Sequence, residues 1–304
     1  MAAKLPGRIA VAAILGLGGC AAGAVAAGPA ASPEPNQEKV RWLAENAVAV
    51  RSIAPADESF ADLMPLVARI GASRVVALGE ATHGDGSTFL AKARLIRFLH
   101  QVMGFDVLAW ESGFFDVPVM AAALRSDVPL PDAAARGLYQ IWSKSAEVQP
   151  VLAYLRATQG TARPLQVVGF DCRVATARSR SELFPAFLFE FFDRLDPVLL
   201  SKAERADLTA MSVGLVPADV YEHPGERRYN RELPAADAGS VEGLLHATGK
   251  PWLFLGLRDL PAGHWLRAPL STGFYFHEAQ VTDLPRLFDA VFFLDEMTPS
   301  HALP

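Results

Sequence analysis

The sequence is poor in cysteine and has no cluster of basic residues. Cys20 and Cys172 are the two cysteines among 304 residues, so a disulfide framework does not organise this fold. We interpret Cys172 as a small buried hydrophobic residue rather than a nucleophile. The formal net charge is −5, and the lysines and arginines are spread along the chain. Nucleic-acid binding needs a basic stripe, and its absence excludes that class of function.

Two catalytic signatures are also missing. There is no Gly-x-Ser-x-Gly turn, which would present a serine nucleophile, and no His-Glu-x-x-His helix, which would hold zinc. Hydrophobic residues make up 51% of the chain and charged residues 20%, which is typical of a globular protein with a sizeable core.

Residues 1–20 have the pattern of an export signal. Lys4 and Arg8 give a positive start, and the apolar stretch 9–17 that follows is too short to span a bilayer as a helix. The stretch closes on Leu17-Gly18-Gly19-Cys20, which resembles the bacterial lipobox, in which the cysteine is lipidated. An ordinary signal peptide that contains a cysteine is the alternative.

The segment 21–38 is rich in alanine, proline and glycine, which is typical of a flexible tether. With a lipid anchor at Cys20, the tether would hold a folded domain over residues 39–304 in the bacterial envelope, facing the periplasm. The membrane is then expected as a partner through the lipid. The sequence does not indicate an oligomeric state.

Helical and extended patterns alternate within residues 39–304. Apolar residues recur at helical spacing over 60–70, 89–103 and 184–195. Short apolar runs predict strands over residues 74–78, 105–110, 165–168, 252–257 and 290–294. This alternation favours an α/β fold with a mostly parallel central sheet and helices on both faces. The pattern fails over 217–243, which predicts a long surface loop.

Acidic residues follow several predicted strands. Glu80 and His83 follow the first strand, Glu111 ends the second, and Asp171 follows the third. Ligands bind beyond the carboxyl ends of parallel strands, so these groups are expected at one edge of the sheet. Acids after strands also cap helices or face solvent, and this reading is preferred for Asp259, Asp295 and Glu296. For Asp171 both readings stay open.

The chemistry of a histidine beside carboxylates is that of a general base. Its imidazole takes a proton from water near neutral pH, and the carboxylates fix its tautomer and stabilise the imidazolium. Because no nucleophile signature is present, direct attack by water is the simplest mechanism, with His83 as base supported by Glu80 and Glu111. One histidine and two glutamates would be a thin ligand set for zinc, so we predict no metal and no cofactor.

Several motifs resemble the erythromycin esterase family, in the family's order. The segment 75–84 is similar to its opening motif, and 106–111 to the strand that ends in its second catalytic glutamate. The segment 89–99 is similar to its next helix, with Arg94 at the characteristic arginine. The match continues through Trp142, Glu147, Arg156, residues 169–171 and residues 288–294.

This resemblance implies hydrolysis of a small-molecule ester or lactone. The family's known substrate is a macrolide lactone, which implies a role in macrolide antibiotic resistance. By the resemblance, His83 activates water with the support of Glu80 and Glu111, and Arg94 and Asp171 position the substrate.

The sequence departs from the family before the fourth strand. The family usually carries a long helical segment and a second histidine motif there, whereas this chain passes from Arg231-Glu-Leu-Pro to Ala238-Gly-Ser-Val. We therefore expect a reduced helical lobe and an internal gap near residues 231–239. The five predicted strands should still form one sheet, and its catalytic edge should be more open than in the family. Two alternatives stay open: an envelope lipoprotein that binds haem or another ligand without turnover, and an inactive, internally deleted copy.

Overall fold

A computed structural model describes residues 8–12, 33–80, 83–173, 176, 178–214, 235–272 and 280–303. The predicted lipidation site Cys20 lies outside these residues, as does the greater part of the predicted loop 217–243. In the part of the chain that is described, no helix has the length and apolar character needed to cross a membrane.

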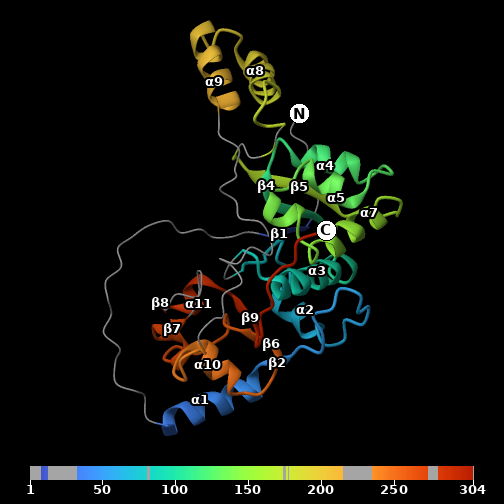
Figure 1. Cartoon of the computed structure of the whole chain (residues 1–304). Helices are drawn as coiled ribbons and strands as arrows, with labels where there is room; N and C mark the ends of the chain where they lie inside the picture. The colour runs from blue at the N-terminus through green and yellow to red at the C-terminus, as the bar shows by residue number, and fades with distance from the viewer. Residues whose placement is uncertain are drawn as a thin grey trace.

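Four strands form a parallel sheet (Figure 1). Its order is β3 (Val75–Ala77), β1 (Arg8–Ala12), β4 (Phe105–Gly113) and β5 (Gln166–Asp171), and each neighbouring pair is parallel. β1 therefore lies between the strands that lead to Glu80 and Glu111. It falls within the residues predicted as an export signal, and cleavage of that signal would remove a central strand.

The last two predicted strands do not join this sheet, so the expectation of one sheet is wrong. β6 (Trp252–Gly256) lies between β2 (Val48–Ala49) and β9 (Ala290–Leu294) in a separate antiparallel sheet. Residues of β6 alternate between two apolar clusters: Leu253 and Leu255 are buried with Leu43 and Leu244 on one face, and Trp252 and Phe254 pack on the other face. A further antiparallel pair joins β7 (Leu270–Thr272) to β8 (Gln280–Thr282).

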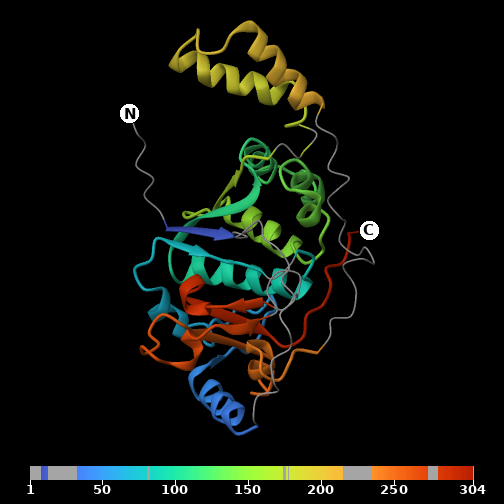
Figure 2. The ribbon, with the colours of Figure 1, turned by 90° about the vertical axis from the view of Figure 1, so that its left-hand side faces the viewer.

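Helix α3 (Gly86–Gln101) lies between the two larger sheets (Figure 2). Phe89 and Ile96 belong to the cluster that includes Leu108 and Trp110 of β4. Phe98 belongs to a second cluster, which is bordered by Trp252, Phe254 and Phe292 of the antiparallel sheet. The helix therefore supplies apolar side chains to two cores.

Apart from a hairpin, the remaining helices of the described residues have between 3 and 14 residues. They are α1 (Pro33–Asn46), α2 (Pro65–Ile70), α4 (Val117–Ala123), α5 (Leu130–Ala135), α6 (Gln140–Ser143), α7 (Gln149–Thr158), α10 (Val241–His246), α11 (Leu284–Leu287) and the 3-10 helix η1 (Trp265–Arg267). The α/β class predicted from the sequence is confirmed, while parallel pairing is limited to the four-stranded sheet.

The hairpin consists of α8 (Leu183–Leu195) and α9 (Lys202–Gly214) and projects from the rest of the molecule (Figures 1 and 2), with Phe184 and Phe187 near the start of α8 packed on Phe115. The pattern over residues 184–195 predicted α8, whereas α9 was not predicted. Leu183, Phe187, Phe191 and Leu195 recur every four residues along α8, and each is exposed.

Candidate active site

His83 and Glu80 form a direct side-chain pair at the carboxyl end of β3. His83 Nδ1 lies 2.8 Å from Glu80 Oε1, and the His83 ring retains 30% of its exposure while the Glu80 side chain retains 2%. When Nδ1–H donates to a carboxylate, the neutral imidazole carries its lone pair on Nε2. The pair thus consists of a partly exposed base, His83, and a buried carboxylate, Glu80.

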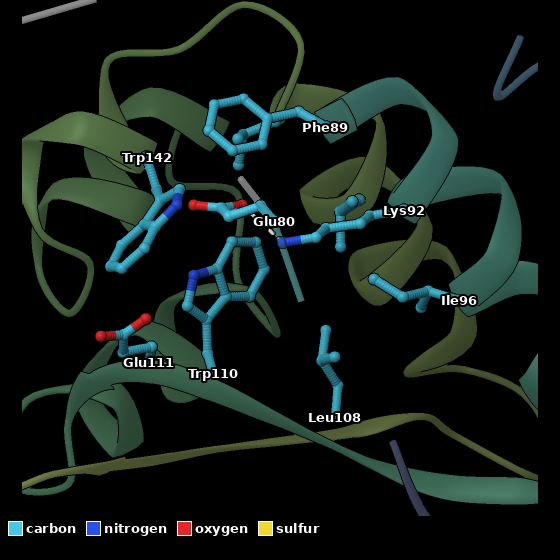
Figure 3. Close-up of a pocket in the computed structure, with 10 residues that line it drawn as sticks. Glu80, Phe89, Lys92, Ile96, Leu108, Trp110, Glu111 and Trp142 are labelled. Atoms are coloured by element: carbon cyan, nitrogen blue, oxygen red, sulfur yellow. Dashed lines mark hydrogen bonds and ion pairs between the residues drawn. The ribbon is translucent and has the colours of Figure 1, made fainter. Parts of the chain in front are cut away.

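Lys92 of α3 supplies the counter-ion of Glu80. Its Nζ lies 2.5 Å from Glu80 Oε2, so the two carboxylate oxygens are shared between a lysine and a histidine. Figure 3 shows the Lys92 side chain pointing at the Glu80 carboxylate. Burial would raise the pKa of Glu80, but Lys92 and His83 outweigh it and hold that pKa below its ordinary value. Glu80 is therefore an anion at neutral pH.

Sequence reasoning missed Lys92, although a signal was present. Phe89, Lys92 and Ile96 are spaced three and four residues apart, so they share one face of α3, and that face is apolar. A lysine on an apolar face needs a buried partner, and Glu80 is the partner.

Glu111 approaches the same edge from β4. Its side chain retains 14% of its exposure, and its Oε1 lies 3.4 Å from Arg173 Nη2. Among the described residues, Glu111 Oε2 is buried and has no hydrogen-bond partner. Burial raises the pKa of Glu111, and the opposing effects of His83 and Arg173 do not cancel it. A buried polar atom without a partner is uncommon and marks a place for water or a substrate group.

Asp171 and Arg173 lie beside Glu111 at this edge of the sheet. Arg173 Nε donates to Asp171 Oδ2 at 2.6 Å, and the Arg173 amide donates to Asp171 Oδ1 at 2.9 Å. The Arg173 guanidinium also lies 5.2 Å from the centre of the Tyr139 ring. The structure thus connects Asp171 to Glu111 through Arg173, a residue that sequence reasoning missed; a positioning role for Asp171 stays a prediction.

Aromatic side chains enclose the charged groups. Trp142 meets the His83 ring edge-on, with ring centres 5.7 Å apart, and lies 6.5 Å from Trp110. The two tryptophans flank the Glu80 carboxylate in Figure 3. They line a cavity of about 40 Å³ together with Glu80, Lys92, Glu111 and apolar residues. Such a volume is enough for water molecules between polar partners.

Arg94 does not lie in this cavity. It is 1% exposed, and its two Nη atoms donate to both carboxylate oxygens of Asp62 and to the backbone oxygens of Ser52 and Ser59. The structure therefore gives Arg94 a place in the anchoring of the segment 52–62. Its predicted contact with substrate has no support in this geometry.

Other expectations for single residues have mixed outcomes. Cys172 is exposed, so its predicted burial is wrong. His100, to which no role was assigned from the sequence, is buried, and its Nδ1 lies 2.6 Å from the Tyr154 hydroxyl oxygen. Asp295 pairs with the exposed His246 at 2.5 Å. Within the described residues, no group of three or more His, Cys, Asp or Glu is arranged to hold a metal ion.

Comparison with known proteins supports the resemblance seen in the sequence. No family model matches the chain. It is 32% identical over 166 residues to a Bacillus subtilis (strain 168) protein named "Putative hydrolase YbfO", and 37% identical over 73 residues to "Erythromycin esterase type II" of Escherichia coli. The chain is thus similar to one protein named as a hydrolase and to one named as an erythromycin esterase.

These matches cover only parts of the proteins compared. They span 53% and 24% of this chain, and only 34% and 17% of the length of the two relatives. A crystal structure of a protein named for succinoglycan biosynthesis has a TM-score of 0.65 and 16% identity, over 89% of this chain and all of that one. At that identity the likeness shows the fold alone.

Proposed function

We propose that this chain hydrolyses an ester or lactone by direct attack of water, with His83 as the general base. The observation that carries the proposal is the contact of 2.8 Å between His83 Nδ1 and Glu80 Oε1. Lys92 keeps this same carboxylate ionised. The names of the two relatives agree with a hydrolase.

The reaction needs one proton to be moved twice. As water forms a bond to the carbonyl carbon, His83 Nε2 takes the proton, and Glu80 stabilises the imidazolium. When the bond to the leaving oxygen breaks, the imidazolium returns the proton to that oxygen. The acid and alcohol products, or the hydroxy acid from a lactone, then leave with His83 neutral again.

Glu111 is proposed to hold the attacking water. Its Oε2 is buried and without a partner among the described residues, and its carboxylate lies in the cavity wall with Glu80. A water that donates to Glu111 Oε2 would satisfy this atom. Arg173, beside Glu111 Oε1, is then placed to bind an anionic product or the oxygen of the carbonyl.

The test compares two histidine variants of the full chain. Purified protein is assayed on a panel of small activated esters and lactones, with His83→Ala expected to lose about 10²–10⁴-fold in kcat/KM. His246→Ala is the control, because it removes another histidine with a carboxylate partner, His246 and Asp295, in the antiparallel half of the molecule. Full activity of His83→Ala would refute the mechanism. Ligand binding without any turnover by the wild-type chain would favour the binding-protein alternative.

Metal dependence is tested in the same assay. Because His83 and Glu80 provide a base without a metal, hydrolysis is expected to survive treatment with a chelator. Activity that is lost on chelation and restored by zinc or manganese would overturn only the metal-free part of the proposal.

Substrate size is proposed to be limited by the reduced helical lobe. Small activated esters should turn over weakly and a bulky macrolide lactone hardly at all, because an uncovered site does not exclude water. Grafting a relative's helical segment between Pro234 and Gly239 should raise macrolide turnover. Equal turnover by the native chain and the graft would show that the segment is not needed.

The envelope location is a further part of the proposal. The lipobox-like sequence ending at Cys20 supports lipidation and a periplasm-facing anchor, and a mature chain that starts at Cys20 would form the parallel sheet without β1. Cys20→Ala should move the protein from the membrane fraction to the soluble fraction. A wild-type protein that is soluble and carries no lipid by mass spectrometry would refute the anchor.

A further inference from the structure

The segment 298–303 crosses the edge of the active site in an extended conformation. Its first half pairs with the loop that carries His83: the Gly86 amide donates to the Thr298 oxygen at 2.8 Å, and the Ser300 amide donates to the Gly84 oxygen at 2.7 Å. Asp85 and Pro299 form the antiparallel bridge between these two bonds. Gly84 is the residue directly after His83, so the segment holds the backbone one residue beyond the base.

The same segment then pairs with the turn that follows Trp142. The Ala146 amide donates to the His301 oxygen at 2.9 Å, and the Leu303 amide donates to the Lys144 oxygen at 2.8 Å. The segment therefore connects two parts of the site that meet at the His83 and Trp142 rings. Neither connection was foreseen from the sequence, because both partners are remote along the chain.

Glu147 fastens the middle of the segment. Its Oε2 accepts from the Ser300 hydroxyl at 2.9 Å and the His301 amide at 3.0 Å, and its Oε1 lies 2.6 Å from His301 Nδ1. The Ser145 hydroxyl donates to the same carboxylate at 3.2 Å. Burial would raise the pKa of Glu147, but its bonds with His301 and Ser300 outweigh it and lower that pKa. The carboxylate is therefore ionised at neutral pH, where charge-assisted hydrogen bonds are strongest.

Open space surrounds Gly84 on the side where a Cβ would lie. Gly84 has φ +84°, a left-handed conformation that disfavours side chains, and an added Cβ would meet no atom within 4 Å. Within the described part of the chain, the Gly84 oxygen accepts its hydrogen bond from the Ser300 amide. Loss of that contact would free the peptide next to His83, and a shift of about 1 Å at a catalytic group can cost as much as 10²-fold in rate.

We propose that Glu147 is a positioning residue for hydrolysis: through Ser300 and His301 it clamps the segment 298–303 against Gly84 and so keeps His83 beside Glu80 and Trp142. This inference rests on the proposed function, because it assigns His83 as the base. The clamp itself is a structural statement that can be tested without any activity.

The experiment compares Glu147→Gln with His301→Ala and Asp295→Asn in the full chain. Glu147→Gln keeps the size of the side chain and removes its charge, whereas His301→Ala removes one exposed ring and one of the bonds to Glu147. Asp295→Asn is the control, since it alters a carboxylate bonded to a histidine in the antiparallel sheet region. Each variant is measured for kcat and KM on a small activated ester and for amide hydrogen exchange at Gly86 and Ser300.

Glu147→Gln should lower kcat about tenfold with KM within about twofold, because the base is displaced while the cavity remains. The amides of Gly86 and Ser300 should exchange faster, and the downfield proton resonance of the His83 Nδ1–H bond to Glu80 should broaden. His301→Ala should show the same changes to a smaller extent, and Asp295→Asn none of them. If Glu147→Gln does not yield folded protein, the His301→Ala variant decides.

Two results would overturn the inference. Unchanged exchange and an unchanged His83 resonance would show that Glu147 does not form the clamp. Faster exchange with kcat within twofold of the wild type would show that the clamp does not position the base. If the wild-type chain hydrolyses no ester, the proposed function fails, while exchange and the His83 resonance still decide whether the clamp holds His83.

Discussion

A buried cation, Arg94, and a partly buried one, Lys92, lie two residues apart on α3 and contact different regions of the molecule. Arg94 lies in the region of residues 52–62, where its guanidinium donates to Asp62 and to two backbone oxygens. Lys92 lies in the cavity region and pairs with Glu80, which in turn holds His83. Arg94 uses its donors on backbone oxygens and a carboxylate together, and so fixes a loop. Lys92 keeps a carboxylate ionised beside the base, and so contributes to the site.

The largest effect on either region is expected from removing the Arg94 guanidinium. Arg94→Met should destabilise the fold by about 3–5 kcal/mol, because Asp62 would stay buried without its partner. Denaturant unfolding measures the loss, and Arg94→Lys, which keeps the charge but not the paired donors, should fall between. The kcat of the folded fraction should stay near the wild-type value. A stable Arg94→Met protein that no longer hydrolyses ester would show that Arg94 acts in the active site.

Lys92→Met should act on hydrolysis rather than mainly on stability. Without the ammonium, the pKa of Glu80 should rise, and a protonated Glu80 no longer stabilises the His83 imidazolium. We expect kcat at neutral pH to fall about 10–100-fold, with most activity kept in Lys92→Arg. Undiminished kcat in Lys92→Met would mean that the Glu80 charge does not matter for the base.

The pH dependence of stability sharpens the same comparison. Because the pKa of Glu80 is lowered in the fold, its ionised form stabilises the protein above its ordinary pKa of 4.5, and this contribution is lost as pH falls through the lowered value. Glu80→Gln should therefore lose less stability than the wild type on acidification below pH 4.5. Melting temperatures of both proteins across that range measure the difference, and parallel curves would argue against a lowered pKa.

The smallest effect is expected at Asp171. Burial is the main cause of the raised pKa of Glu111, and the charge of Asp171 adds to it. Asp171→Asn removes that charge and releases Arg173 toward Glu111, and both changes lower the pKa of Glu111. The acid limb of the pH profile of kcat should move to lower pH by a fraction of a unit. A limb that moves upward would mean that Asp171 acts on another group.

The sequence predicted the chemistry of single motifs better than their pairing. The apolar run at residues 290–294 matches β9, and Glu80 after β3 and Glu111 within β4 do line one cavity. The antiparallel pairing of β6 and β9 could not be read from these runs, because an apolar run reports burial but not the direction of its neighbour. β1 was hidden for a different reason, since its apolar residues have the composition of an export signal as well as of a strand.

The candidate site shows the same limit. His83, Glu80 and Glu111 were found because they follow strands that end at one edge of the sheet. Arg94 was expected at the site from family resemblance, although its neighbour Lys92 is the cation that reaches Glu80. The contact of Ser300 with Gly84 joins residues more than two hundred positions apart, and nothing local in either segment indicates it.

The position of α3 between the two sheets has a consequence for unfolding. Its residues belong both to the cluster around Trp110 and to the cluster bordered by Trp252 and Phe292, so each sheet loses part of its apolar contacts if the other is lost. The two sheets should therefore unfold in one cooperative transition, monitored equally by probes in either half. The hairpin of α8 and α9 shares neither cluster, and its amides should exchange by a separate opening of lower free energy.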